Sequence, residues 1–232
     1  MKNIVGFITR MLVRMIGKKR IIHYSFDPYE LRAYNMLDYG YLNDIGWWNS
    51  FRSHKPMDKN NNALPWTTYS FIDFIEPRLS HDLSLFEFGC GNSTLFFSKR
   101  VKEITSVEHD PEWLKLVVVN KHPNSTLILA DKKEDEYSAS VINVNKKFDL
   151  IFIDGLFRND CTKNSINCLS ERGVIVIDDS ERSDESDENY NESFELLKQQ
   201  GFKRIDFWGF SPGSFYRKAT SIFYKAGNCL DI

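Results

Sequence analysis

The chain has 232 residues, which is enough for one α/β domain with an N-terminal extension and too few for two ordinary domains. Its hydrophobic content of 42% excludes an intrinsically disordered chain, and its net charge of −2 provides no basic field, so we expect no nucleic-acid partner. The four cysteines have no zinc-site spacing, and we expect reduced thiols in a cytoplasmic protein.

Residues 1–26 are predicted to form a basic amphipathic helix. Arg10, Arg14 and Lys18 recur every four residues and share one helical face. Charges interrupt every apolar run well before the ~20 residues of a spanning helix, and Arg10 and Arg14 also interrupt the apolar region of a signal peptide. Two interpretations stay open: the helix lies peripherally at the inner face of a membrane, or it packs on the rest of the protein.

Residues 27–80 are predicted to form an N-terminal cap and one helix. The first part, 27–62, is rich in aromatic residues and turn formers, which predicts an irregular cap that ends in an exposed turn. The helix is expected to start near Thr67 or Thr68 and to end around Glu76, before a proline.

Residues 81–232 read as one α/β domain. Apolar runs alternate with helical spacing, as a doubly wound sheet requires; they occur at 85–88, 104–107, 126–130, 148–153, 173–177, 202–208 and 219–225. Asp110 followed by Pro111 predicts a helix start. The last two runs are joined by SPGSFYRK, which is too short for a helical crossover, so these strands should pair antiparallel.

The segment LFEFGCGNST predicts a ligand-binding turn between a strand and a helix. Gly89 and Gly91 let the backbone approach a ligand, and Glu87 can accept a hydrogen bond from an ammonium group or a hydroxyl. Thr94 stands where a dinucleotide fingerprint requires its third glycine. Glu108 follows at the next strand tip, 19 residues beyond Gly89. The alternative is a tight turn without a ligand.

With these residues in place, the chain resembles the class I methyltransferases that use S-adenosylmethionine (SAM). FEFGCGNST is similar to the glycine motif of that family, and VEHD is similar to the acidic strand tip that holds the ribose. The resemblance covers residues 65–232. It implies a Rossmann-like sheet of seven strands in the order 3-2-1-4-5-7-6, with strand 7 antiparallel and helices on both faces. The cofactor would lie across the carboxyl ends of strands 1 to 4.

The resemblance also implies a set of cofactor-binding residues. Asp131 would contact adenine, Asp154 would lie beside the methyl donor, and the start of the N-terminal helix would cover the methionine part. The set consists of Trp66, Thr67, Glu87, Gly89, Cys90, Gly91, Asn92, Ser93, Glu108, His109, Asp131 and Asp154. For LPWTTY, an ordinary core-facing helix start stays an equal alternative.

The fifth predicted strand ends in VIVIDDS, which places Asp178 and Asp179 near Asp154. This trio resembles the Mg²⁺ site of O-methyltransferases of the catechol and macrolide-sugar type, and hard carboxylate oxygens suit that ion. The family's D-G-x-x-Y continuation is missing after Asp154. A metal-free site, with Asp154, Asp179 or His109 as the base, stays open, and so does a solvated acidic loop.

Asp154, Asp179 and Arg158 are the predicted catalytic residues. Arg158 either clamps the methyl acceptor or neutralises the aspartates. IDGLFR replaces the D/N-P-P-Y/F motif of enzymes that methylate nitrogen, so we expect transfer to a hydroxyl oxygen of a small molecule or glycan. An aromatic wall over the site is the alternative to core packing for Trp47, Trp48, Trp208, Phe210 and Tyr216.

The motif set also resembles bacterial methyltransferases of surface-polysaccharide pathways. Two other functions are compatible with the same fold. One is an aminopropyl transferase that makes polyamines, although Arg158 disfavours a cationic acceptor. The other is a non-catalytic scaffold that keeps the cofactor site.

Overall fold

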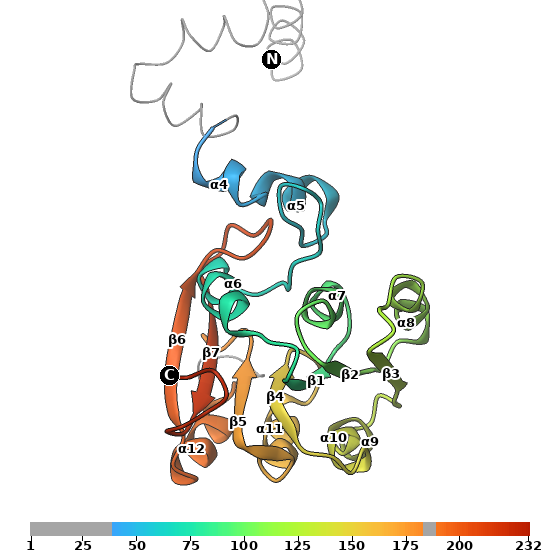
Figure 1. The fold of residues 1–232 in the computed structure, drawn as a ribbon, viewed down its shortest axis with the longest axis vertical. Coiled ribbons are helices and arrows are strands. Elements are labelled where there is room, and N and C mark those ends of the chain that lie inside the picture. Colours follow the sequence, from blue (N-terminus) through green and yellow to red (C-terminus); the bar gives the residue numbers. More distant parts are fainter. Residues whose placement is uncertain (1–38, 183–188) are drawn as a thin grey trace, which may run out of the picture.

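The computed structural model describes residues 39–182 and 189–232. They form a seven-stranded sheet in the order β3-β2-β1-β4-β5-β7-β6 (Figure 1). The strands are β1 (Ser84–Phe88), β2 (Glu103–Glu108), β3 (Ser125–Leu129), β4 (Phe148–Ile153), β5 (Leu169–Ile177), β6 (Lys203–Gly209) and β7 (Lys218–Tyr224). β7 pairs antiparallel with both β5 and β6, while the other pairs are parallel. The predicted fold and strand order are confirmed.

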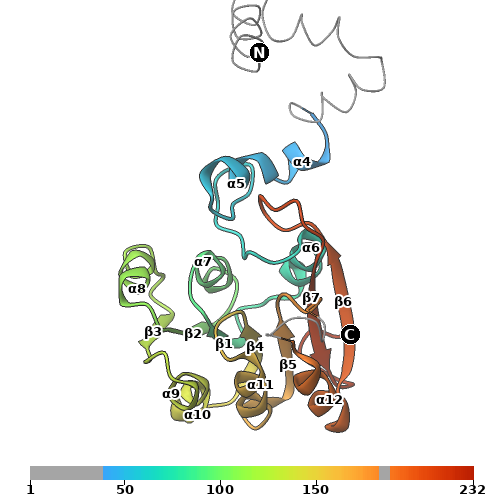
Figure 2. The same cartoon turned by 180° about the vertical axis from the view of Figure 1, so that it is seen from behind.

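Helices cover both faces of the sheet. α6 (Tyr69–Ile75), α7 (Asn92–Ser98) and α8 (Pro111–Val118) lie on one face. The other face carries α9 (Glu134–Ser138), α10 (Ser140–Asn143), α11 (Arg158–Ile166) and α12 (Asn191–Gln199), as Figure 2 shows from behind. The Asp110 side chain caps α8 by accepting hydrogen bonds from the N–H groups of Glu112 and Trp113, as its sequence predicts.

The central strands are buried on both faces because helices cover both. Leu85 packs into the cluster under α6 and α7, while its neighbour Phe86 packs into the cluster under α9 to α12. The same alternation separates Phe152 from Ile151 in β4. Successive side chains of a strand point to opposite faces, so these near-continuous apolar runs fill two cores at once.

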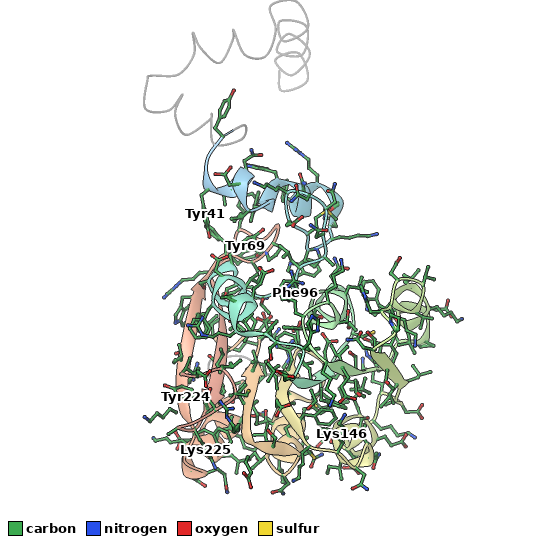
Figure 3. All side chains as sticks on the ribbon, in the orientation of Figure 1. Tyr41, Tyr69, Phe96, Lys146, Tyr224 and Lys225 are labelled. Atoms are coloured by element: carbon green, nitrogen blue, oxygen red, sulfur yellow. The ribbon has the colours of Figure 1, made fainter. Side chains whose placement is uncertain are left out.

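The cap contains more regular structure than its sequence suggests. Two short helices, α4 (Tyr41–Asp44) and α5 (Trp47–Ser53), precede the turn at 58–62, so the expectation of an irregular cap is wrong for this part. α6 follows, capped by Thr68 and continued by a 3₁₀ turn, η1 (Glu76–Arg78). Figure 3 shows Tyr69 of α6 and Phe96 of α7 on the side of the sheet that faces the cap.

The connection between β6 and β7 is held against the cap. The Trp47 indole donates a 3.1 Å hydrogen bond to the carbonyl of Ser214, and Trp47 also packs on Phe51 and Phe215. Gly213 has φ +70°, and a Cβ there would lie 2.8 Å from the Phe51 nitrogen. These contacts place the loop over the carboxyl end of the sheet.

Because β7 runs antiparallel, its first residue lies at the carboxyl ends of the parallel strands. In the parallel strands β1, β4 and β5 the carboxyl ends lie together, whereas β7 runs the other way and begins there. Ile177, at the end of β5, is opposite Ser221 of β7. Lys218, the first residue of β7, therefore lies beside the residues that follow β5.

The predicted basic helix of residues 1–26, with its membrane alternative, and the first part of the cap lie outside the described residues. Within 39–182 and 189–232, no helix has the length and apolarity that crossing a bilayer would require.

Candidate active site

The glycine turn brings the end of β1 against the end of β4. Gly89 has φ +86°, which favours glycine, and a Cβ there would lie 3.0 Å from the carbonyl oxygen of Asp154. The Asp154 N–H in turn donates to the Phe88 carbonyl at 3.1 Å. The Trp113 indole covers the turn by donating a 2.7 Å hydrogen bond to the Cys90 carbonyl. The turn is thus packed closely against Asp154.

Glu87 lies beneath this turn and is fully buried. Its Oε2 accepts hydrogen bonds from Thr94 at 2.5 Å and from Ser106 at 2.6 Å. Oε1 accepts no hydrogen bond from the described residues. Burial raises the pKa of Glu87 to about 7, although the hydrogen bonds from Ser106 and Thr94 act to lower it. A buried carboxylate oxygen without a donor suits a ligand cation or donor that arrives on binding.

Glu108 closes the same region from the tip of β2. One oxygen accepts from the backbone N–H groups of His109 and Asp110, at 2.8 and 2.9 Å, and the other accepts from Cys90 at 3.3 Å. The His109 Nδ1 lies 2.8 Å from the Glu108 Oε1. These bonds orient the carboxylate toward the glycine turn.

A cavity of about 810 Å³ opens between the tips of β1, β2 and β4. Six of the predicted cofactor residues line it: Gly89, Cys90, Ser93, Glu108, His109 and Asp154. Arg158 also lines it, as do Tyr190 and the neighbouring rings of Tyr137 and Phe157. The cavity lies at the carboxyl ends of the strands, where open α/β sheets bind their ligands.

Other predicted cofactor residues do not line this cavity. Thr67 is fully buried, and Trp66 belongs to a second, smaller cavity. The Asn92 side chain donates to the Pro56 carbonyl, and the exposed Asp131 pairs with Lys133. Gly91 and the buried Glu87 are also absent from the lining. Asn92 and Asp131 thus make contacts within the protein, and the buried Thr67 hydroxyl has no hydrogen-bond partner among the described residues. Cofactor contacts for Trp66, Thr67, Asn92 and Asp131 stay predictions.

The smaller cavity, of about 300 Å³, lies on the other side of Asp154. Its lining consists of Trp66, Asp154, Asp178, Asp179, Ser211, Ser214 and Lys218. Trp66 is held by a 2.8 Å hydrogen bond from its indole to the Pro212 carbonyl and is 48% exposed. The Ser211 hydroxyl is buried and has no hydrogen-bond partner among the described residues. Asp154 is the residue that the two cavities share.

The three predicted aspartates do converge here. One oxygen from each of Asp154, Asp178 and Asp179 lies within 4.8 Å of those from the other two. Asp178 is 1% exposed, which excludes the alternative in which this pair merely begins a solvated loop. Asp179 has φ +53°, an uncommon backbone conformation that aspartate tolerates.

Comparison with known proteins agrees with this geometry. Residues 86–180 match the family model described as a methyltransferase domain. This segment contains the glycine turn, Glu108 and the acidic trio. No curated protein sequence matches the chain.

Solved structures share the fold of this chain. An O-methyltransferase from Bacillus cereus in complex with SAH has a TM-score of 0.56 at 11% identity, covering 81% of this chain and 92% of the other. A putative caffeoyl-CoA O-methyltransferase from Staphylococcus aureus has a TM-score of 0.52 at 15% identity, covering 85% of this chain and 98% of the other. At these identities the likeness concerns the fold.

Three cations neutralise the acidic trio. Arg158 Nη2 lies 3.0 Å from Asp154 Oδ1 and 3.5 Å from Asp179 Oδ2. Lys218 Nζ lies 3.3 Å from Asp178 Oδ2 and also pairs with Asp179. Arg182 Nη2 lies 3.1 Å from Asp179 Oδ2. Of the two predicted roles of Arg158, the structure shows neutralisation of the aspartates.

These contacts, together with burial, shift the pKa values of the three carboxyl groups in different directions. Burial and the Asp178 carboxylate raise the pKa of Asp154 to about 8, against the effect of Arg158. Burial also raises the pKa of Asp178. For Asp179 burial acts in the same direction, but Lys218 and Arg158 outweigh it and lower its pKa. Asp179 is thus the most strongly ionised member of the trio.

The acidic trio offers the carboxylate oxygens that Mg²⁺ prefers, but its charge is already compensated. Carboxylate oxygens are suitable ligands, but a dication also needs uncompensated negative charge. The ammonium of Lys218 already bridges Asp178 and Asp179, and Arg158 already bridges Asp154 and Asp179. The residues present therefore do not fit a divalent cation in this arrangement.

Lys218 and Ser211 are two residues of the smaller cavity that the sequence analysis did not name, and Tyr137, Phe157 and Tyr190 are further examples in the larger one. Lys218 and Ser211 lie at the ends of the β6–β7 connection. The signal for Lys218 was available, because the predicted antiparallel pair already implies that strand 7 begins at the carboxyl edge. Ser211 carries no such signal, since an isolated serine in a loop is uninformative. Phe210 and Tyr216 are exposed and line neither cavity, which excludes core packing for them, and the aromatic wall stays a prediction.

Proposed function

We propose that this protein transfers the methyl group of SAM to a hydroxyl oxygen of a small molecule or glycan. The observation that carries the proposal is the position of Asp154 between two cavities. The larger contains the glycine turn and Glu108, which suit a nucleoside cofactor. The smaller contains polar side chains and one exposed indole, which suit a hydroxylated acceptor.

The larger cavity is assigned to SAM. Glu108 is the acceptor for the ribose hydroxyls, because a carboxylate at this strand tip forms strong charge-assisted hydrogen bonds. The unpartnered oxygen of Glu87 would accept from the ammonium of the methionine part. When bound, SAM supplies a methyl group on a sulfonium, which an oxygen nucleophile takes by direct displacement.

The smaller cavity is assigned to the acceptor. The buried Ser211 hydroxyl lacks a partner, so a ligand hydroxyl would satisfy it. The Trp66 indole presents a flat apolar face of the kind on which sugar rings stack. These features support a glycan or another polyhydroxylated acceptor.

Asp154 is the residue placed to accept the proton that the acceptor hydroxyl loses. Arg158 bonds to its Oδ1, whereas Oδ2 has no hydrogen bond within the described part of the chain. Its side chain is 25% exposed and faces both cavities. In methyl transfer the new C–O bond forms as the C–S bond breaks, and the sulfur keeps the electron pair. His109 is held at Glu108 and lines the larger cavity, so it is less well placed as the base.

The geometry disfavours the aminopropyl transferase alternative. A diamine acceptor requires carboxylates that are free to pair with its ammonium groups. Here Arg158, Lys218 and Arg182 already pair with the acidic trio. We therefore expect no spermidine when the protein is incubated with decarboxylated SAM and putrescine.

Calorimetric titration with S-adenosylhomocysteine (SAH), the demethylated product, tests the proposal. We expect saturable binding with one site per chain, and absence of binding would overturn the assignment. The variant Asp154→Asn should keep SAH affinity and lose methyl transfer from labelled SAM to a panel of monosaccharides. If wild type binds SAH and labels no hydroxyl in any acceptor, the scaffold alternative gains support.

A further inference from the structure

We propose that the ammonium of Lys218 permanently takes the place of a divalent cation between the aspartates, so that the acceptor is held without a metal. The inference rests on the proposed function, because it names what holds the acceptor in the smaller cavity. It departs from the metal-dependent enzymes that the acidic trio resembles.

The backbone fixes Lys218 at this place. It is the first residue of β7 and pairs with Gly209 of β6. Two residues later, Thr220 donates a 2.6 Å hydrogen bond to Asp178 Oδ1, so the same strand anchors the carboxylate from a second point. Because the strand already orders the backbone of Lys218, forming the ion pair costs only the rotamer freedom of its side chain.

The ammonium bridges two carboxylates as a bound cation would. Nζ lies 3.3 Å from Asp178 Oδ2 and pairs with Asp179 Oδ1. Both lysine and aspartates are shielded from solvent: the Lys218 side chain is 19% exposed, Asp179 15% and Asp178 1%. Attraction between charges is stronger here than at a surface, because little water screens it.

Arg158 prevents the third carboxylate from joining a metal. Besides its contact with Asp154, it donates to the carbonyls of Gly155 and Asp178 at 3.0 and 2.6 Å. A guanidinium held by three such bonds does not swing away easily, and it is 11% exposed. A dication entering the trio would therefore face two fixed positive charges.

The arrangement leaves Lys218 able to bind an acceptor. An ammonium has three N–H donors, and the described residues occupy two of them. Because Lys218 lines the smaller cavity together with Ser211, its third donor can meet an acceptor oxygen there. A lysine provides one positive point charge, so it orients an oxygen nucleophile without the chelate that a metal gives a diol.

Binding of Mn²⁺ to the full-length chain, followed by electron paramagnetic resonance, tests the proposal without an activity assay. Wild type should show no saturable site at millimolar Mn²⁺. Lys218→Met keeps a long unbranched side chain and removes its charge. This variant should bind Mn²⁺ at least about tenfold more tightly than wild type. Adding Asp178→Asn to that variant should abolish the gained site.

The control is Lys198→Met, because Lys198 is an exposed lysine of α12 that pairs with Glu195 and lines neither cavity. It should behave like wild type toward Mn²⁺. A saturable site in wild type that Asp179→Asn removes would overturn the proposal, and so would a folded Lys218→Met chain that binds no Mn²⁺. If Lys218→Met does not fold, Lys218→Gln replaces it, and the wild-type titration still decides. SAH affinity, measured in parallel, reports on the proposed function separately.

Discussion

The Thr94 hydroxyl donates a 2.5 Å hydrogen bond to Oε2 of Glu87 and accepts one of 3.0 Å from the N–H of Gly91. Thr94 stands where a dinucleotide-binding turn would have its third glycine. Its side chain instead ties the glycine turn to the buried carboxylate. This single hydroxyl therefore links the shape of the turn to the orientation of Glu87.

Glu87 should make the stability of the protein depend on pH. Burial raises its pKa from 4.5 to about 7, so the folded chain binds a proton more tightly than the unfolded chain. The stabilising contribution is fully present below pH 4.5 and is lost as pH rises through about 7. The size of this loss is on the order of 3 kcal/mol. Urea unfolding across this range should show the decline, and Glu87→Gln should remove it.

A matched control for this measurement is Glu195→Gln. Glu195 is an exposed residue whose side chain pairs with Lys198. Its replacement should leave the pH dependence of the free energy of unfolding as in wild type. Equal slopes for wild type and Glu87→Gln would contradict the raised pKa of Glu87.

Replacing Glu108 should weaken SAH binding far more than replacing Asp131. Glu108→Ala removes a buried carboxylate that lines the larger cavity, and we expect a loss of about 10–100-fold. Asp131→Ala removes an exposed side chain outside the lining, and we expect a change within about threefold. Titration calorimetry measures both, with thermal unfolding to verify the fold. A large loss for Asp131→Ala would restore its predicted adenine contact.

Gly155 should not tolerate a side chain. A Cβ at this position would collide with the Tyr137 hydroxyl and would lie 3.0 Å from the Gly89 nitrogen. Gly155→Ala should therefore destabilise the fold by about 1–3 kcal/mol, as overpacking does. Adding Tyr137→Phe should recover part of this loss because it removes the colliding oxygen. Gly209→Ala is the control, since a Cβ there meets only Ser70 Oγ at 3.6 Å. Similar losses for both glycines would refute the collision.

The parts of the structure that depend on local patterns could be predicted from the sequence. Apolar runs marked each strand because the central strands are buried on both faces, and the turn chemistry of Asp110 marked α8. Convergence of Asp154, Asp178 and Asp179 followed from parallel strands, whose carboxyl ends share one edge.

The features that could not be predicted from the sequence depend on tertiary contacts between distant segments. Trp66 turns toward the acidic trio because its indole bonds to Pro212, a residue 146 positions away. Lys218 compensates Asp178 across 40 positions. The predicted antiparallel pair indicates that β7 begins at this edge, but no local pattern records which side chains pair there. The charge balance of the site, and with it the fit to a metal, therefore became visible only in the fold.

Arg158 should be more important for stability than a surface cation. Its side chain is 11% exposed, and removing it leaves the Asp154 and Asp179 carboxylates partly uncompensated in a buried setting. Arg158→Ala should lower the free energy of unfolding by about 3–5 kcal/mol. Arg158→Lys should lower the free energy of unfolding by less than Arg158→Ala, because it keeps the positive charge. Some loss remains, because lysine lacks the planar guanidinium that reaches Asp154, Asp178 and Gly155. The control is Lys115→Ala, which breaks an ion pair whose side chains are 70% and 78% exposed and should change stability by less than about 0.5 kcal/mol. Urea unfolding measures all three, and comparable losses for Arg158→Ala and Lys115→Ala would show that the Arg158 contacts contribute no more than a surface pair.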